Sequence, residues 1–324
     1  MNPGEAVRFP KVRPRALFAS RPVLTFLIVV AVWIGASFVK PGFGAFGHLR
    51  YLVELGAVVG LAAIGQTFVV IAGGIDLSVG AIITVSAVGA PLVALAFDES
   101  GAFAALITLA AATVIGVLNG LGVAFLRAHP MIMTLAMATF LQGLLILLAG
   151  GSAISAQSPL LEWLGSARPG GVPAGVLVWA IASVLSLLAL HATPFGARVF
   201  ALGANSLAAT LSGVNVPATT VAVYAISGLT AGMTGLLLLG MNGQGYVGIG
   251  DPYLLSSIAA VVLGGTSILG GSGTYAGSIP GAVLLVTITG LITVVNASPG
   301  WRSILFGSLI LALLLISGRE ARRR

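Results

Sequence analysis

The sequence lacks cysteine and has few charged residues, and each shortage excludes a class of protein. Without cysteine the chain forms no disulfide, no thiolate nucleophile and no cysteine-ligated zinc site. Only 7% of the 324 residues are charged and 58% are hydrophobic, whereas soluble domains carry about 25% charged residues. Such a chain cannot cover a soluble fold with polar surface. The composition therefore predicts an all-α polytopic membrane protein.

Lysine and histidine are also scarce, which limits nucleotide, metal and catalytic sites. The only lysines, Lys11 and Lys40, lack the preceding glycines of a GxxxxGK[ST] nucleotide-binding loop. The three histidines are scattered, each beside an expected helix end, and no GxSxG motif occurs. We therefore expect no catalytic residue, no metal site and no cofactor on this chain.

The net charge of +7 does not indicate nucleic-acid binding, because the basic residues gather at the two termini and are hardly interleaved with aromatics. Apolar runs near 20 residues recur from end to end and predict about ten transmembrane helices. Their expected ranges are 23–39, 51–72, 78–97, 102–126, 131–149, 173–191, 218–240, 253–269, 275–295 and 301–317. The first run leads straight into further spans, so we interpret it as a helix rather than a signal peptide.

Ten spans place both termini on one side. Eleven basic residues then share the side of the termini and four lie on the other, so the termini are expected to be cytoplasmic. The expected organisation is a cytoplasmic basic segment 1–22, one transmembrane domain 23–317 and a cytoplasmic basic tail 318–324. Four GxxxG spacings, which begin at Gly56, Gly116, Gly228 and Gly277, indicate close helix packing.

The longest polar connection is residues 192–217, on the cytoplasmic side. Its apolar spacing predicts a short helix between Asn205 and Gly213, capped by Asn205 or Ser206. The helix interiors hold almost no ionisable residues, which disfavours ion coupling within the chain. We therefore expect the driving force on another chain, docked at this loop. The expected docking residues are Gly203, Asn205, Ala208, Ala209, Leu211, Ser212 and Gly213.

The stretch QTFVVIAGGIDLSVG, residues 66–80, begins as a membrane helix and then breaks at Gly73, Gly74 and Asp76. Two accounts remain open. In the first, which we favour, Asp76 lies near the cytoplasmic interface, caps the next helix and is partly solvated. In the second, the glycines and Asp76 line a water-filled cavity. The candidate pathway or hinge residues are Gln66, Gly73, Gly74, Asp76, Ser78, Asn119, Gln244 and Asp251.

Residues 73–89 resemble residues 248–264, since both show glycine, then aspartate, then an apolar helix rich in small residues. The equivalent helices would be five spans apart and would run in opposite directions. This predicts an inverted repeat of helices two to five against seven to ten, with Asp76 and Asp251 at opposite membrane faces. The Gly-rich stretch 264–277 is interpreted as a tight turn between two helices.

Three segments carry a family resemblance. GGIDLSVG (73–80), TPFGARVFALGANSLAATLSGVNV (193–216) and VVLGGTSILGGSGTYAGSIPGA (261–282) resemble the permease subunits of bacterial ribose-type ABC importers. The resemblance runs from about residue 50 to 317. It departs in the loop ANSLAATLSGV. In the family a charged residue is common in the middle of this loop, and this sequence has none there.

The resemblance implies an inner-membrane permease that moves a monosaccharide by alternating access. It implies partners: ABC ATPase subunits that hold ATP and Mg, a soluble sugar-binding protein, and a second permease copy in a homodimer or heterodimer. The alternative is the same type of importer with a nucleoside or an autoinducer as its substrate. The hypothesis from a different functional class is a membrane enzyme or a channel.

Overall fold

Helices make up almost all of the computed structural model, which describes residues 21–311 except 41, 98–100, 156–157, 295–297, 299, 302–303 and 309–310. The α-helices are α2 (Arg21–Val39), α3 (Phe46–Ile71), α4 (Val79–Phe97), α5 (Gly101–Phe125), α6 (Pro130–Ala149), α7 (Pro159–Ser166), α8 (Ala174–His191), α9 (Pro194–Ala204), α10 (Ser206–Leu211), α11 (Val216–Asn242), α12 (Asp251–Leu263) and α13 (Tyr275–Val294). A 3₁₀ turn, η1 (Pro169–Gly171), and the antiparallel strands β1 (Ile154–Ser155) and β2 (Gln244–Gly245) complete the described chain.

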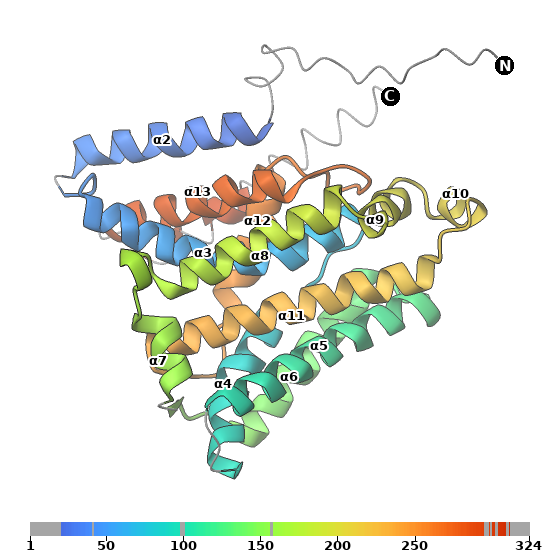
Figure 1. Cartoon of the computed structure of the whole chain (residues 1–324), viewed down its shortest axis with the longest axis horizontal. Coiled ribbons are helices and arrows are strands. Elements are labelled where there is room, and N and C mark those ends of the chain that lie inside the picture. Colours follow the sequence, from blue (N-terminus) through green and yellow to red (C-terminus); the bar gives the residue numbers. More distant parts are fainter. Residues whose placement is uncertain are drawn as a thin grey trace.

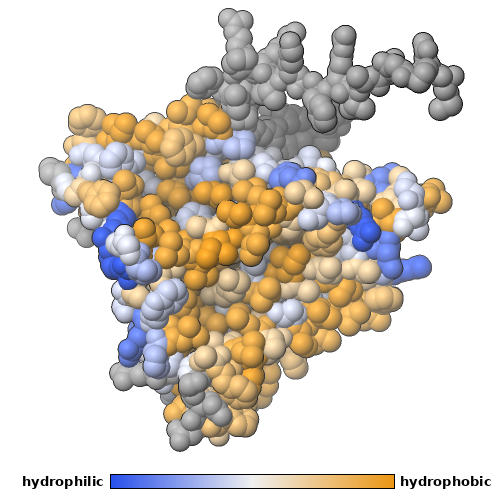
Figure 2. Space-filling model, in the orientation of Figure 1, coloured by the Kyte–Doolittle hydropathy of each residue, from blue (hydrophilic) through white to orange (hydrophobic). Residues whose placement is uncertain are grey.

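Eight of the described helices are long and apolar enough to cross a membrane: α2, α3, α4, α5, α6, α8, α11 and α13. Figure 1 shows most of them side by side, with α4 inclined to the others. Apolar side chains cover the face over α8 and α11, while hydrophilic ones gather toward the two ends of these helices (Figure 2). This distribution is the one that a bilayer favours, and the all-α polytopic prediction is confirmed.

Two of the ten expected spans differ from the structure or lie beyond its description. The span expected at 253–269 is the helix α12, which ends at Leu263 after 13 residues. At 1.5 Å per residue this helix is roughly 20 Å long, shorter than the hydrocarbon core of about 30 Å. The span expected at 301–317 lies largely outside the described residues, as do the basic segments at both termini.

Close helix contacts form where the GxxxG spacings predict them. A Cβ built on Gly116 would lie 2.2 Å from the carbonyl oxygen of Tyr224, and one on Gly228 would lie 2.3 Å from that of Ala112. These glycines therefore bring the backbones of α5 and α11 into direct contact. Gly277 in α13 approaches Gly264 at the end of α12 in the same way.

The helices pack as two related halves. Helix α5 packs against α4 of its own half and α11 of the other, and α13 correspondingly packs against α12 of its own half and α3 of the other. Helices α3 and α11 pair with each other and run antiparallel, since Gly65 lies against Ser227 whereas Gly74 lies against the Tyr224 hydroxyl. This exchange of contacts supports the inverted repeat, with α3 and α4 equivalent to α11 and α12.

The loop at 192–217 contains two helices rather than one. Helix α10 matches the expected short helix, and the side chain of Asn205 caps it by accepting from the Ala208 N–H at 2.9 Å. Helix α9 was not expected, although Thr193 followed by Pro194 is a cap and first-turn pair. The short helix α7 and the β1–β2 pair were also missed.

Candidate functional site

The break between α3 and α4 is a buried hydrogen-bonded turn centred on Asp76. One carboxylate oxygen of Asp76 accepts from the backbone N–H of Ser78 at 2.9 Å and from its hydroxyl at 2.6 Å. The other oxygen accepts from the Ser227 hydroxyl of α11 at 2.7 Å. No ion pair of Asp76 occurs in the described part of the chain, so neutral donors alone stabilise this carboxylate.

Two further helices extend this network around the turn. Asn119 of α5 donates from its amide nitrogen to the Ser78 hydroxyl at 2.8 Å. Thr134 of α6 accepts from the Leu77 N–H at 3.0 Å and donates to the carbonyl oxygen of Pro130 at 2.9 Å. The break is therefore held by α5, α6 and α11 together, and a shift of any one of them disturbs it.

The favoured prediction for Asp76 is wrong in one respect. Asp76 does bind the N–H of a residue at the start of α4, as the capping account requires, but its side chain is fully buried rather than partly solvated. The second account holds only for the two glycines, because Gly73 and Gly74 line a cavity of about 430 Å³ that Asp76 does not reach. The structure thus separates the glycines from the carboxylate.

The starts of α4 and α12 meet head to head. A Cβ on Gly250 would lie 2.0 Å from the Gly80 carbonyl oxygen, and the Gly250 N–H donates to the Thr84 hydroxyl at 3.1 Å. Gly80 also approaches the Cα of Asp251. The expected placement of Asp76 and Asp251 at opposite membrane faces is therefore wrong, because only three residues separate Asp76 from Gly80.

The loop that contains α9 and α10 contacts this break through glycine. Gly203, at the end of α9, has no room for a side chain, since its Cβ would lie 1.8 Å from the Ile71 carbonyl oxygen and 2.6 Å from the Gly271 nitrogen. The same Ile71 oxygen accepts a hydrogen bond from the Gly271 N–H at 2.9 Å. The Gly-rich stretch around Gly271, predicted only as a tight turn between two helices, therefore also forms a contact with α9.

Helix α10 projects from the bundle, as Figure 1 shows. Of the expected docking residues, Ala209 is buried against the protein, while Asn205, Ala208, Leu211, Ser212 and Gly213 are exposed. Leu211 is 81% exposed and Leu207, which is not among the expected docking residues, is 69% exposed. The two leucines stand four residues apart, so one side of α10 presents an apolar surface.

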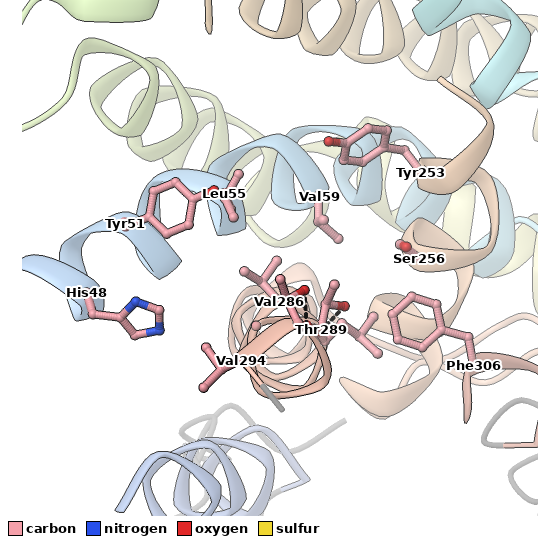
Figure 3. Close-up of a pocket in the computed structure, with 13 residues that line it drawn as sticks. His48, Tyr51, Leu55, Val59, Tyr253, Ser256, Val286, Thr289, Val294 and Phe306 are labelled. Atoms are coloured by element: carbon pink, nitrogen blue, oxygen red, sulfur yellow. Dashed lines mark hydrogen bonds between the residues drawn. The ribbon is translucent and has the colours of Figure 1, made fainter. Parts of the chain in front are cut away.

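A second cavity, of about 320 Å³, lies between α3, α12 and α13. In Figure 3 the side chains of His48, Tyr51, Leu55 and Val59 come from α3 and face Val286 and Thr289 of α13, with Tyr253 and Ser256 of α12 beside them. We call it the aromatic cavity. It combines aromatic rings with hydroxyl groups, a combination that suits a small hydroxylated molecule.

Gln66 lies on the same face of α3 as Leu55 and Val59, because the spacings of four and seven residues match the helix period. Its side chain is fully buried, and neither amide atom has a hydrogen-bond partner among the described residues. Gln244, another candidate pathway or hinge residue, is by contrast exposed in β2, where it pairs with Ser155.

The family is decided by comparison with known proteins. Residues 49–314 match the family described as "Branched-chain amino acid transport system / permease component". The chain belongs to this permease family. No solved structure matches the chain significantly.

The permease is also similar to curated sugar permeases. It is 32% identical over 308 residues to the ribose import permease protein RbsC of Escherichia coli strain K12, which covers 94% of this chain and 95% of that protein. It is 31% identical over 300 residues to RbsC of Bacillus subtilis strain 168, covering 92% and 91%. The xylose transport system permease protein XylH of Escherichia coli strain K12 is 27% identical, covering 85% and 86%. The resemblance noted from the three sequence segments is confirmed.

Proposed function

We propose that this permease is the membrane subunit of an ATP-driven importer that moves a monosaccharide across the bacterial inner membrane. The named relatives act on ribose and xylose, which supports a pentose-like sugar. The low content of ionisable residues in the helices also supports a driving force outside the chain. ATP and Mg then belong to a partner ATPase, and both termini lie in the cytoplasm.

The observation that carries the mechanism is the junction at Gly203. This residue touches the end of α3, which belongs to one half of the repeat, and the connection between α12 and α13, which belongs to the other. A displacement of α9 and α10 therefore acts on both halves at once. Since Ile71 immediately precedes the break at Gly73, the displacement reaches the turn between α3 and α4.

Alternating access follows from this arrangement. An ATPase bound to the exposed leucines of α10 moves α9, and α9 shifts the α3–α4 break relative to α12. The head-to-head starts of α4 and α12 then separate or close. Such a shift needs partners that bind the two states with different affinity. We therefore propose an ATPase on the α10 side, a sugar-binding protein on the opposite side, and a second permease copy.

The test is to introduce Ala208→Arg, which places a charge between the two exposed leucines of α10. We expect the variant to lose co-purification with the ATPase subunit and uptake of D-ribose, D-xylose and D-galactose. The matched control is Ala153→Arg, because Ala153 is an exposed alanine in the connection between α6 and β1, remote from α10. This control should retain the ATPase. The importer assignment fails if no ATPase associates with the wild type and Ala208→Arg leaves uptake intact.

A further inference from the structure

The cavity at the end of α3 carries a cationic side chain whose role the import mechanism does not explain. This cavity, which we call the basic cavity, has a volume of about 430 Å³ and lies between the ends of α3 and α5 and the starts of α6, α10 and α11. Its polar and hinge residues are Gly73, Gly74, Arg127, His129, Ser206, Thr220 and Tyr224. None of the four described acidic residues, Glu54, Asp76, Glu162 and Asp251, lines it.

Arg127 occupies an unusual backbone position. Its φ is +53°, and it is the only non-glycine residue of the described chain with a positive φ. Glycine adopts this conformation without steric cost, whereas arginine does not. The side chain that incurs this cost lines the basic cavity, and it has no ion pair or hydrogen bond within the described chain. Arg127 is exposed and lines the cavity, so its unpaired guanidinium is accessible to a planar or tetrahedral anion.

Two other features of the same cavity favour an anion. Helix α6, of 20 residues, begins here with Pro130, which has no N–H, and the N–H groups of Ile132 and Met133 donate to the His129 carbonyl oxygen, so the start of this helix contributes the positive end of its dipole rather than free donors. Tyr224 is 3% exposed, and its hydroxyl has no hydrogen-bond partner among the described residues. That hydroxyl lies beside Gly74, since a Cβ built on Gly74 would be 2.7 Å from it. A buried hydroxyl without a partner is costly unless a ligand satisfies it.

We propose that the basic cavity binds a phosphate group, held by the Arg127 guanidinium and the Tyr224 hydroxyl near the positive end of the α6 dipole. The phosphate belongs either to a lipid headgroup at the membrane surface or to a small soluble phosphate, and both present the same anionic oxygens. The site does not depend on the proposed import function. A phosphate bound here would lie between Ser206, at the start of α10, and the glycines that follow α3. These two segments flank the contact between Gly203 and Ile71.

The experiment measures the unfolding temperature of the full chain from tryptophan fluorescence. In the first arm, delipidated protein in detergent is titrated with inorganic phosphate, with chloride at matched ionic strength as the reference. In the second arm, the protein is placed in nanodiscs with or without phosphatidic acid and then titrated with phosphate. We expect a saturable rise in the unfolding temperature in at least one arm. A rise with phosphatidic acid that abolishes the response to free phosphate identifies the lipid as the source.

The decisive variant is Arg127→Gly, which suits the positive φ and so keeps the fold. It should weaken phosphate binding by about tenfold or more, since a charge-assisted pair is lost. Tyr224→Phe should weaken binding about fivefold. Arg198→Gln, which removes an exposed arginine of α9 outside the cavity, should leave binding unchanged.

Two results overturn the proposal. One is the absence of any saturable shift of the wild type in both arms. The other is a shift that persists in Arg127→Gly. If the first result came with a response to D-ribose, it would assign the basic cavity to the path of the sugar.

Discussion

Asp76 and Asp251 follow the same pattern of glycine, aspartate and apolar helix, yet the structure treats them differently. Asp76 is fully buried and accepts three hydrogen bonds from serine groups. Asp251 is exposed in the first turn of α12, where the N-cap is Gly250 and no side-chain cap bond forms. Both stretches reach the same junction, because Gly80 lies against Gly250.

The difference arises from the helices that surround each acid. Around Asp76, α5, α6 and α11 supply Asn119, Thr134 and Ser227, whose polar groups satisfy the turn and its carboxylate. A buried carboxylate is tolerated only when such donors compensate for the lost water. Asp251 stays at the surface and needs no donors. A shared sequence pattern therefore fixes a turn, and its neighbours decide whether the acid becomes part of the core.

The largest expected effect is that of removing the Asp76 carboxylate. Asp76→Ala leaves the Ser78 N–H and two serine hydroxyls without their acceptor, so we expect a loss of about 3 kcal/mol in the free energy of unfolding. Asp251→Ala should cost at most about 1 kcal/mol, since this acid only favours the positive end of α12. Denaturant unfolding in detergent measures both. Equal losses would show that the two acids do not differ as their burial indicates.

Asp76→Asn separates charge from hydrogen bonding at the same position. If this variant transports a sugar at the wild-type rate with normal expression, the negative charge is not required, and the turn around residues 73–80 is structural.

The contact between the two half-helices is the next test. Gly250→Ala places a methyl group 2.0 Å from the Gly80 carbonyl oxygen, and such overpacking should cost about 2 kcal/mol. Gly89→Ala is the matched control in α4, because nothing lies within 4 Å of its Cβ position. The control should be neutral or stabilise α4 by up to about 1 kcal/mol. A harmless Gly250→Ala would contradict the head-to-head junction.

Ser227→Ala tests the hydroxyl donor that α11 supplies to Asp76 but not to Asp251. The variant removes the hydrogen bond to the second carboxylate oxygen of Asp76, and a bond to a charged group contributes about 1.5 kcal/mol or more. Ser256→Ala in α12 is the control, since the Ser256 hydroxyl donates only to the Pro252 carbonyl oxygen of its own helix. We expect the control to change the unfolding free energy by less than about 0.5 kcal/mol. Similar losses of unfolding free energy for the two variants would show that the hydrogen bond from Ser227 to Asp76 gives no particular stability to the α3–α4 turn.

The smallest expected effect concerns the single hydrogen bond that joins the two starts. Thr84→Val removes the acceptor of the Gly250 N–H and should cost about 1 kcal/mol. Hydrogen exchange at the Gly250 amide measures the effect locally. Faster exchange at Gly250 with unchanged exchange in α9 is expected, whereas an unchanged Gly250 amide would show that Thr84 does not hold the junction.

Much of this arrangement was predictable from local sequence. Apolar run length predicted the eight spanning helices, the cap at Asn205 predicted α10, and the glycine spacings predicted that helices pack closely, although not which ones. Each of these features depends on residues near one another in the chain. The approach of Gly80 to Gly250 does not, because 170 positions separate them and no local pattern encodes their distance.

Several functional candidates were missed for the same reason. Ser227 and Thr134 stand singly within apolar helices, where a hydroxyl most often bonds to its own backbone. The only indication of them in the sequence was that Asp76, if buried, requires hydrogen-bond donors from other segments of the chain. Gly203 and Gly271 were visible as glycines, but the contact that excludes a side chain comes from Ile71, in another helix.

The sequence by itself determined that this chain is a helical membrane protein with a broken helix after Ile71 and a short capped helix at α10. Composition, the length of apolar runs and helix capping depend on residues close together in the chain, so the sequence alone predicts them. Only the tertiary structure decided that Asp76 is buried while Asp251 is exposed, and that α9 touches both halves of the repeat. Those outcomes depend on which backbones meet, and burial is a property of the whole assembly of helices rather than of any one segment.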